Sequence, residues 1–247
     1  MTRLFRAELL KLSTTRTARG LLAAALTITA LLAVATLVLA GRDGNASLGT
    51  AGNLHNVIGG SGLASVLALV LGILGMAGEF RHGTVTGTFL ITPDRGRVVA
   101  NKLAAHALAG FGLALATVLA GLAVTLPWLA VEGAHVDLFN LEVGRALAGT
   151  LLAGALYGTA GVAIGALFRN QVAAVVVTLA WTQFIENGVL ASLMPKVARW
   201  LPMGAAAAIT NPGGQLLSMW AGVLLFAGYV FLLATAGTRF VVRRDVA

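Results

Sequence analysis

The chain has 247 residues, of which 58% are hydrophobic and only 11% are charged. A soluble globular protein carries roughly 25% charged residues, so this composition excludes a water-covered fold and predicts a protein embedded in lipid. The net charge is +8, but the basic side chains lie in short segments between apolar runs, without the solvated basic face that nucleic acid requires. We therefore expect them to face an anionic lipid bilayer, with no nucleic-acid partner.

The first 20 residues are basic and precede the first apolar run. Within residues 2–17, Phe5, Leu9 and Leu12 recur on one side of a helix, and most of the basic side chains lie off that stripe. This pattern predicts a short interfacial helix that lies on the membrane surface. The apolar run that follows has about 20 residues, longer than the 7–15 of a cleaved signal peptide, so we expect an uncleaved anchor.

Six apolar runs are long enough to cross a membrane, which takes about 20 residues at 1.5 Å each. The fifth run contains Glu186 and has a polar end. We therefore predict an all-α, polytopic membrane protein, organised as a single transmembrane permease domain over residues 1–247. The predicted spans are residues 21–40, 57–78, 103–126, 146–168, 172–190 and 216–236.

The basic residues predict the orientation, because Lys and Arg are enriched in cytoplasmic segments. With the N-terminus inside, the inner segments hold 13 Lys and Arg and the outer segments hold 4. We therefore expect both termini to be cytoplasmic. The high content of Ala, Gly, Val and Arg is typical of a GC-rich bacterial genome, so the expected location is a bacterial cytoplasmic (inner) membrane.

Glycine recurs in the fourth span as Gly154, Gly158, Gly161 and Gly165. Small residues four apart let helix backbones approach closely. This spacing indicates either packing within the bundle or a specific dimer face.

The fifth span is followed by a segment, residues 186–215, that contains Pro195, Pro202 and Pro212. We expect broken, partly re-entrant helix there, because irregular backbone at membrane depth must be buried in protein.

Three polar residues, Gln183, Glu186 and Asn187, lie near the outer end of the fifth span. On an α-helix, positions 183 and 187 share a face and 186 lies beside them. Polar residues inside a membrane are candidates for function, so these three are a possible substrate path or a contact to the outer segment. The alternative is a span end that meets water.

No catalytic motif is present. The chain has no cysteine, which excludes disulfides and thiolate metal sites. It has no Gly-Lys dipeptide, and therefore no phosphate-binding P-loop of its own, and no His-Glu-x-x-His pattern. The four histidines are scattered rather than set at metal-ligand spacing. We therefore expect a protein that is not an enzyme, without catalytic residues, cofactor or metal.

The connection between the second and third spans, residues 79–102, is the most informative stretch. It leaves the membrane with Glu79 and Arg81, continues to the apolar run Phe89-Leu90-Ile91, and is broken by Pro93 before a basic return. The apolar run, in an otherwise polar loop, fits insertion into a partner's groove as a helix. It fits equally a segment that folds back onto the bilayer interface.

The pattern Gly-Glu-Phe-Arg-x-Gly-Thr over residues 78–84 is followed by Leu90, Pro93, Arg95, Arg97 and the pair Lys102-Leu103. Together with Arg-Ala-Glu-Leu-Leu-Lys-Leu at residues 6–12, it resembles the permease subunits of type-two ABC exporters.

The resemblance implies that residues 79–102 contain a coupling helix that docks onto a separate ATP-hydrolysing subunit. It implies a second permease copy, as a homodimer or heterodimer, and export of a substrate that the sequence does not identify. The alternative is a secondary transporter, or another multi-span membrane protein, without an ATPase partner. A secondary transporter predicts charged residues near the bilayer centre, which the first four spans and the sixth lack. The implied coupling residues are Glu79, Phe80, Arg81, Gly83, Thr84, Phe89, Leu90, Pro93, Arg95 and Arg97.

Overall fold

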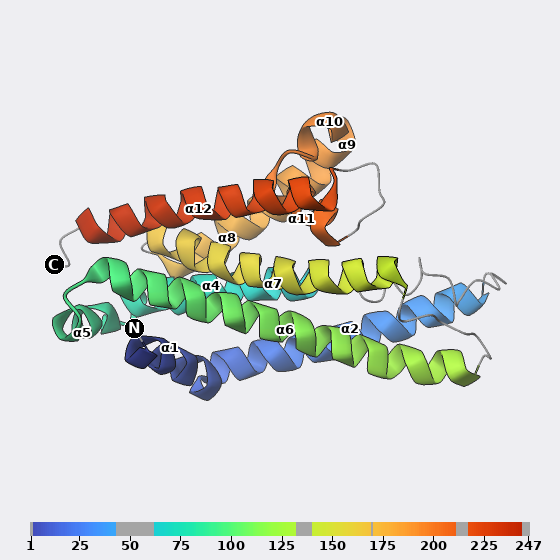
Figure 1. Ribbon diagram of the computed structural model, residues 1–247, viewed down its shortest axis with the longest axis horizontal. Coiled ribbons are helices and arrows are strands. Elements are labelled where there is room, and N and C mark those ends of the chain that lie inside the picture. The colour runs from blue at the N-terminus through green and yellow to red at the C-terminus, as the bar shows by residue number, and fades with distance from the viewer. Residues whose placement is uncertain (1, 43–61, 132–139, 169, 211–216, 244–247) are drawn as a thin grey trace.

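A computed structural model describes residues 2–42, 62–131, 140–168, 170–210 and 217–243. Every regular element in these ranges is a helix, and six helical segments are long and apolar enough to cross a membrane, which confirms the predicted all-α fold (Figure 1). The elements are α1 (Thr2–Thr14), α2 (Arg16–Arg42), α4 (Gly62–Arg81), α5 (Thr84–Ile91), α6 (Arg95–Val131), α7 (Leu141–Leu167), α8 (Gln171–Leu179), the π-helix η1 (Ala180–Leu190), α9 (Ala191–Leu193), α10 (Pro195–Ala198), α11 (Pro202–Thr210) and α12 (Met219–Arg243).

The short helix α1 is separated from the first long helix by a single residue, Thr15. Arg19 of α2 folds back, and its guanidinium donates hydrogen bonds to the carbonyl oxygens of Ser13 (3.3 Å) and Thr14 (2.9 Å). The last carbonyls of a helix have no partner within the helix. Arg19 therefore caps α1, which ends three residues before the boundary that the sequence predicts.

The third long helix, α6, is much longer than its predicted span. It has 37 residues, or about 55 Å at 1.5 Å per residue, against a hydrocarbon core of about 30 Å. It begins at Arg95 because Asp94 caps it. One carboxylate oxygen of Asp94 accepts from the backbone N–H of Arg97 at 3.0 Å, and the other pairs with the Arg97 guanidinium at 2.8 Å.

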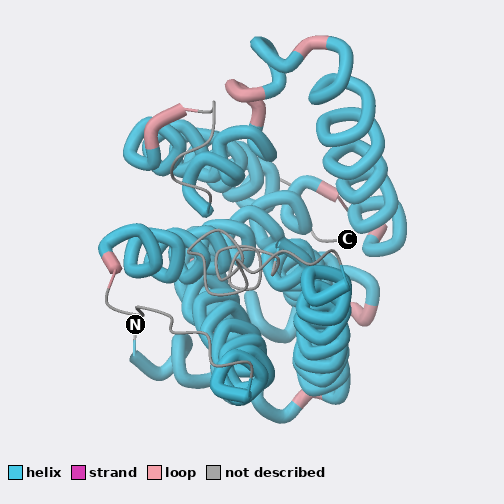
Figure 2. The backbone as a smooth tube through the Cα atoms, turned by 90° about the vertical axis from the view of Figure 1, so that its right-hand side faces the viewer, coloured by secondary structure: helices cyan, strands magenta, loops and turns pink. Residues whose placement is uncertain are grey.

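Glycines hold α7 against α4 and α6 at backbone distance. A Cβ at Gly158 would overlap the carbonyl oxygen of His106, and one at Gly161 would overlap that of Leu69. Gly154 faces Gly110 in the same way. Helices packed this closely gain dispersion contacts that larger residues would forbid. These glycines therefore pack the inside of the bundle and do not form a dimer face. Figure 2 shows the helices of the bundle gathered against one another.

The fifth span continues from α8 through η1 and α9, and the chain breaks at Met194. Pro195 and Pro202 begin α10 and α11, a position where proline loses no hydrogen bond. The chain then returns to the bundle, because Ile209 of α11 is buried and its carbonyl faces Gly149 of α7. Figure 1 shows α9 and α10 projecting from the bundle and α11 beside α12. Pro212 lies outside the described residues.

The start of α6 lies next to the end of α12, since the Arg95 guanidinium donates to the carbonyl oxygens of Val241 (3.3 Å) and Val242 (3.4 Å). The helix α1 also packs against α6, and α5 lies at the same end (Figure 1). We call this end of the bundle, where α1, α5, the start of α6 and the end of α12 meet, the terminal end.

Candidate functional sites

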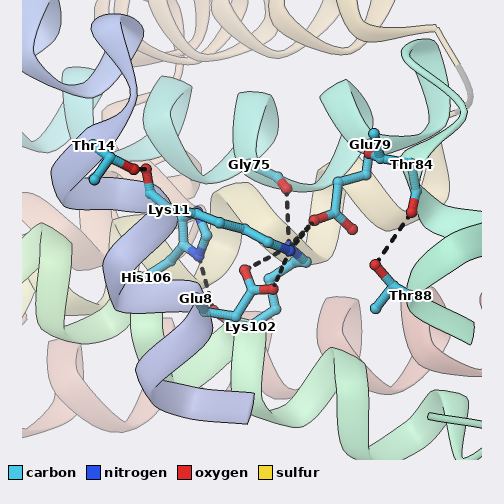
Figure 3. A network of polar contacts seen from close by, with 9 residues as sticks. All are labelled: Glu8, Lys11, Thr14, Gly75, Glu79, Thr84, Thr88, Lys102 and His106. Carbon is cyan, nitrogen blue, oxygen red and sulfur yellow. Dashed lines mark hydrogen bonds and ion pairs between the residues drawn. The ribbon is translucent and has the colours of Figure 1, made fainter. Parts of the chain in front are cut away.

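Four charged side chains from three helices meet at the terminal end (Figure 3). The ammonium of Lys102 on α6 donates to Glu8 of α1 at 2.7 Å, to Glu79 of α4 at 2.9 Å and to the carbonyl oxygen of Gly75 at 3.2 Å. The ammonium of Lys11 donates to Glu8 and to Glu79, both at 2.9 Å. We call Glu8, Lys11, Glu79 and Lys102 the charge cluster.

The charge cluster is neutral overall, and its Glu8 and Lys102 are buried whereas Lys11 is half-exposed. Lys102 is 1% exposed, and Glu8 is also buried. An ammonium group has three donors, and the three bonds of Lys102 use them all. Burying unpaired charges would cost several kcal/mol each. The cluster therefore fixes α1 against α4 and α6, since each carboxylate needs both lysines.

The two members of the cluster on α1 have shifted pKa values. Burial raises the pKa of the Glu8 carboxyl, but Lys102 and Lys11 outweigh burial and hold that pKa below its ordinary value of 4.5. Burial lowers the pKa of the Lys11 ammonium, but hydrogen bonds from it to Glu79 and Glu8 outweigh burial and raise that pKa above 10.5. Both residues are therefore charged near neutral pH.

One helical turn after Lys102, His106 is buried between α6 and α4. Its Nδ1 lies 2.9 Å from the carbonyl oxygen of Lys102, and its ring lies against Gly75, where any Cβ would collide with it. The Nε2 atom is buried without a hydrogen-bond partner among the described residues. A cavity of about 520 Å³ extends from His106 past the charge cluster to Thr88 of α5.

The sequence-predicted coupling residues divide into an outward and an inward set. The segment leaves α4, turns at Gly83, whose φ of 67° favours glycine, and forms α5. Leu90 and Ile91 at the end of α5 are 80% and 86% exposed. The other predicted residues that face outward are Arg81, Thr84, Pro93 and Arg97.

The inward set attaches α5 to the bundle. Phe80 and Phe89 pack against a buried cluster that includes Met76 and Val241. The Arg95 guanidinium lies 5.2 Å from the centre of the Phe89 ring. Glu79 also belongs to this set, because its carboxylate pairs with Lys11 and Lys102 within the charge cluster. The inward set therefore attaches α5 to the bundle, whereas the outward set lies on the exposed surface.

The three polar residues of the fifth span differ in burial. Among them only Glu186 is buried, at 2% exposed, whereas Gln183 is partly buried and Asn187 is exposed. Its carboxylate accepts from the backbone N–H of Met203 at 2.7 Å and from the indole N–H of Trp181 at 3.2 Å. Glu186 therefore contacts α11 and is buried there rather than exposed.

The π-helix η1 brings Trp181 and Glu186 to the same side of the fifth span. Trp181 and Glu186 are five residues apart, which would put them about 140° apart around an α-helix. A π-helix closes its turns at five residues and brings them together. The grouping of Gln183, Glu186 and Asn187 stays a prediction, and of the three only Glu186 is buried and contacts Trp181 and Met203.

A second cavity, of about 320 Å³, lies between α7, α8, η1 and α12, next to Glu186. Its wall is apolar and aromatic, and includes Tyr157 and Phe226, whose ring centres are 4.8 Å apart. The Tyr157 hydroxyl lies 3.1 Å from the sulfur of Met203. Such a space can take a small apolar molecule.

Sequence reasoning left Glu8, Lys11, Lys102 and His106 out of the candidate site. One signal was available for Lys102, which lies in a largely apolar run of α6. An ionisable residue in such a run is expected to have a partner. Nothing in the sequence identifies Glu8 as that partner, because 94 residues separate the two.

Six apolar helices around a buried small-residue core make this chain a multi-pass membrane protein. No family model and no curated protein matches it. In the part of the chain that the structure describes, no group of three or more His, Asp or Glu side chains could hold a metal ion.

Proposed function

We propose that the chain is the membrane-spanning permease subunit of an ATP-binding-cassette exporter, driven by a separate ATPase subunit. The terminal end is then cytoplasmic, in keeping with the excess of Lys and Arg in the segments assigned to that side. The motif over residues 78–103 and the absence of a P-loop in the chain support the proposal, because the ATPase is then another polypeptide.

The observation that carries the proposal is the exposed pair Leu90 and Ile91 on a short helix that is attached on both sides. Exposed apolar pairs on such a helix suit a partner's groove. A displacement of α5 would be transmitted to α4, and the charge cluster, which includes Glu79 of α4, would transmit it to α6 and α1. ATP-driven closure of the ATPase dimer would thus move several helices of each of two permease copies.

The test is purification from the native host in mild detergent. The wild-type chain is expected to retain an ATPase subunit, and the double variant Leu90→Ser with Ile91→Ser is expected to lose it. Leu193→Ser is the matched control, because Leu193 is an exposed leucine on α9, away from α5. Absence of any ATPase from the wild-type preparation, or equal loss from the control, contradicts the proposal.

One observation favours a secondary transporter instead. Glu186 is a buried carboxylate within a helix long enough to span the membrane, as ion coupling requires. Transport that stops when the proton gradient is collapsed, and continues in vesicles without ATP, would select this alternative. Inhibition by vanadate would select the exporter.

A further inference from the structure

The cavity beside Glu186 combines aromatic rings with one carboxylate. Tyr157, Trp181, Phe226 and Tyr229 all contribute to its wall. The faces of aromatic rings attract cations, and the attraction grows where water is excluded. A ligand in this cavity therefore meets apolar surface, ring faces and a single acidic group.

The carboxylate of Glu186 has no cationic partner. None of the ion pairs among the described residues includes it, and its two hydrogen bonds come from the neutral N–H groups of Trp181 and Met203. A buried charge without a counter-charge is costly, so a bound cation would offset that cost. The charge cluster at the terminal end differs in this respect, because its two carboxylates are already paired with its two lysines.

The geometry also provides a way for a cation to reach the carboxylate. The bond from Met203 is short, at 2.7 Å, whereas the bond from Trp181 is longer, at 3.2 Å, and therefore weaker. Trp181 is half-exposed, so its indole can move while Met203 keeps Glu186 in position.

We propose that this cavity binds a lipophilic cation, a small aromatic or aliphatic body with one protonated amine, and that Glu186 is its counter-ion. The inference deepens the proposed function by naming the substrate class. It rests on that function only for the export step, since binding needs no ATPase. A cavity of 320 Å³ lies at the lower end of the range that holds small organic ligands.

The test is equilibrium binding to the purified full chain in lipid nanodiscs, with two probes of equal shape. Naphthylmethylamine is protonated at pH 7, and naphthylmethanol is its uncharged counterpart. The amine is expected to bind at least about tenfold more tightly, and Glu186→Gln is expected to abolish that preference. Glu142→Gln, at an exposed acid in α7, is expected to keep it.

The uncharged probe controls for folding, because it should bind Glu186→Gln as it binds the wild type. A second pair of variants tests the place of binding. Val177 is a half-exposed residue of the cavity wall and Val176 is a half-exposed neighbour outside it. Val177→Trp should weaken binding of both probes, and Val176→Trp should not.

Equal binding of amine and alcohol overturns the proposal and indicates an apolar filler such as a lipid chain. Survival of the preference in Glu186→Gln, or no binding of either probe, also overturns it. These outcomes are independent of ATPase co-purification. If the amine binds but no ATPase co-purifies, the cation site stands and the exporter proposal fails. If an ATPase co-purifies but the amine preference is missing, only the proposed ligand class fails.

Discussion

The carboxylate of Glu8 lies 2.7 Å from the ammonium of Lys102, which is the shortest contact in the charge cluster and joins α1 to α6. Both side chains are buried, Lys102 at 1% and Glu8 at 6% exposed. The pair therefore makes α1 part of the bundle at this point, although the sequence predicts a helix that lies on the membrane.

Removing Lys102 should be strongly destabilising. In Lys102→Met, the carboxylates of Glu8 and Glu79 lose their buried counter-charge, and we expect a loss of about 3–5 kcal/mol in the free energy of unfolding. Unfolding of the detergent-solubilised protein measures it. Lys196→Met, at an exposed lysine of α10, is the control and should change stability by less than about 0.5 kcal/mol. An equal loss of stability in Lys102→Met and Lys196→Met would show that the ion pairs of Lys102 do not stabilise the fold.

A double-mutant cycle should detect the pair itself. Glu8→Gln removes the acid that Lys102 contacts most closely. The double variant Glu8→Gln with Lys102→Met should therefore lose less free energy of unfolding than the two single variants lose in sum. Residues in one ion-pair network couple by about 0.5–3 kcal/mol. Strictly additive losses would show that Glu8 and Lys102 contribute independently.

Docking of α1 should depend on pH in acid. The folded-state pKa of Glu8 lies below 4.5, so its stabilising contribution is complete above that pH and is lost as the pH falls through the lower, folded-state value. For Lys11, whose pKa is raised above 10.5, the contribution is complete below 10.5 and is lost above it. Between these limits the contributions of Glu8 and Lys11 should not change with pH.

Spin labels can measure this dependence, since the chain has no cysteine to interfere. Labels at Ala7→Cys on α1 and Ala100→Cys on α6, both exposed positions, should move apart only below pH 4.5. In the Glu8→Gln background the acid-dependent step should be missing. A separation that begins between pH 5 and 8 would assign the change to another group.

The close crossing of α6 and α7 predicts opposite effects for two glycines. In Gly158→Ala, the new methyl group would overlap the backbone carbonyl of His106, and the helices must separate at a cost of about 1–3 kcal/mol. In Gly112→Ala on α6, nothing lies within 4 Å of the new methyl group, and better helix propensity should stabilise by about 0.5–1 kcal/mol. Thermal unfolding measures both variants. Similar shifts in both would contradict the crossing.

The sequence predicted the elements well because each depends on local composition. An apolar run of about 20 residues is long enough to cross a membrane, and Pro195 and Pro202 each begin a new helix. Pro93 is expected to break any helix in residues 79–102, and α5 ends at Ile91, before it. The sequence also identified Glu186 as a residue to explain, since a carboxylate in an apolar run is costly.

The sequence by itself therefore determined that this chain is a membrane protein with six apolar spans, and it singled out the apolar run Phe89-Leu90-Ile91, of which the structure exposes Leu90 and Ile91. Only the tertiary structure decided which charges meet. Glu79 faces Lys102 and Lys11, and Glu186 in the π-helix η1 faces Met203 of α11. Pairing across the bundle depends on helix rotation and crossing distance, which contacts between distant residues set and local periodicity does not encode.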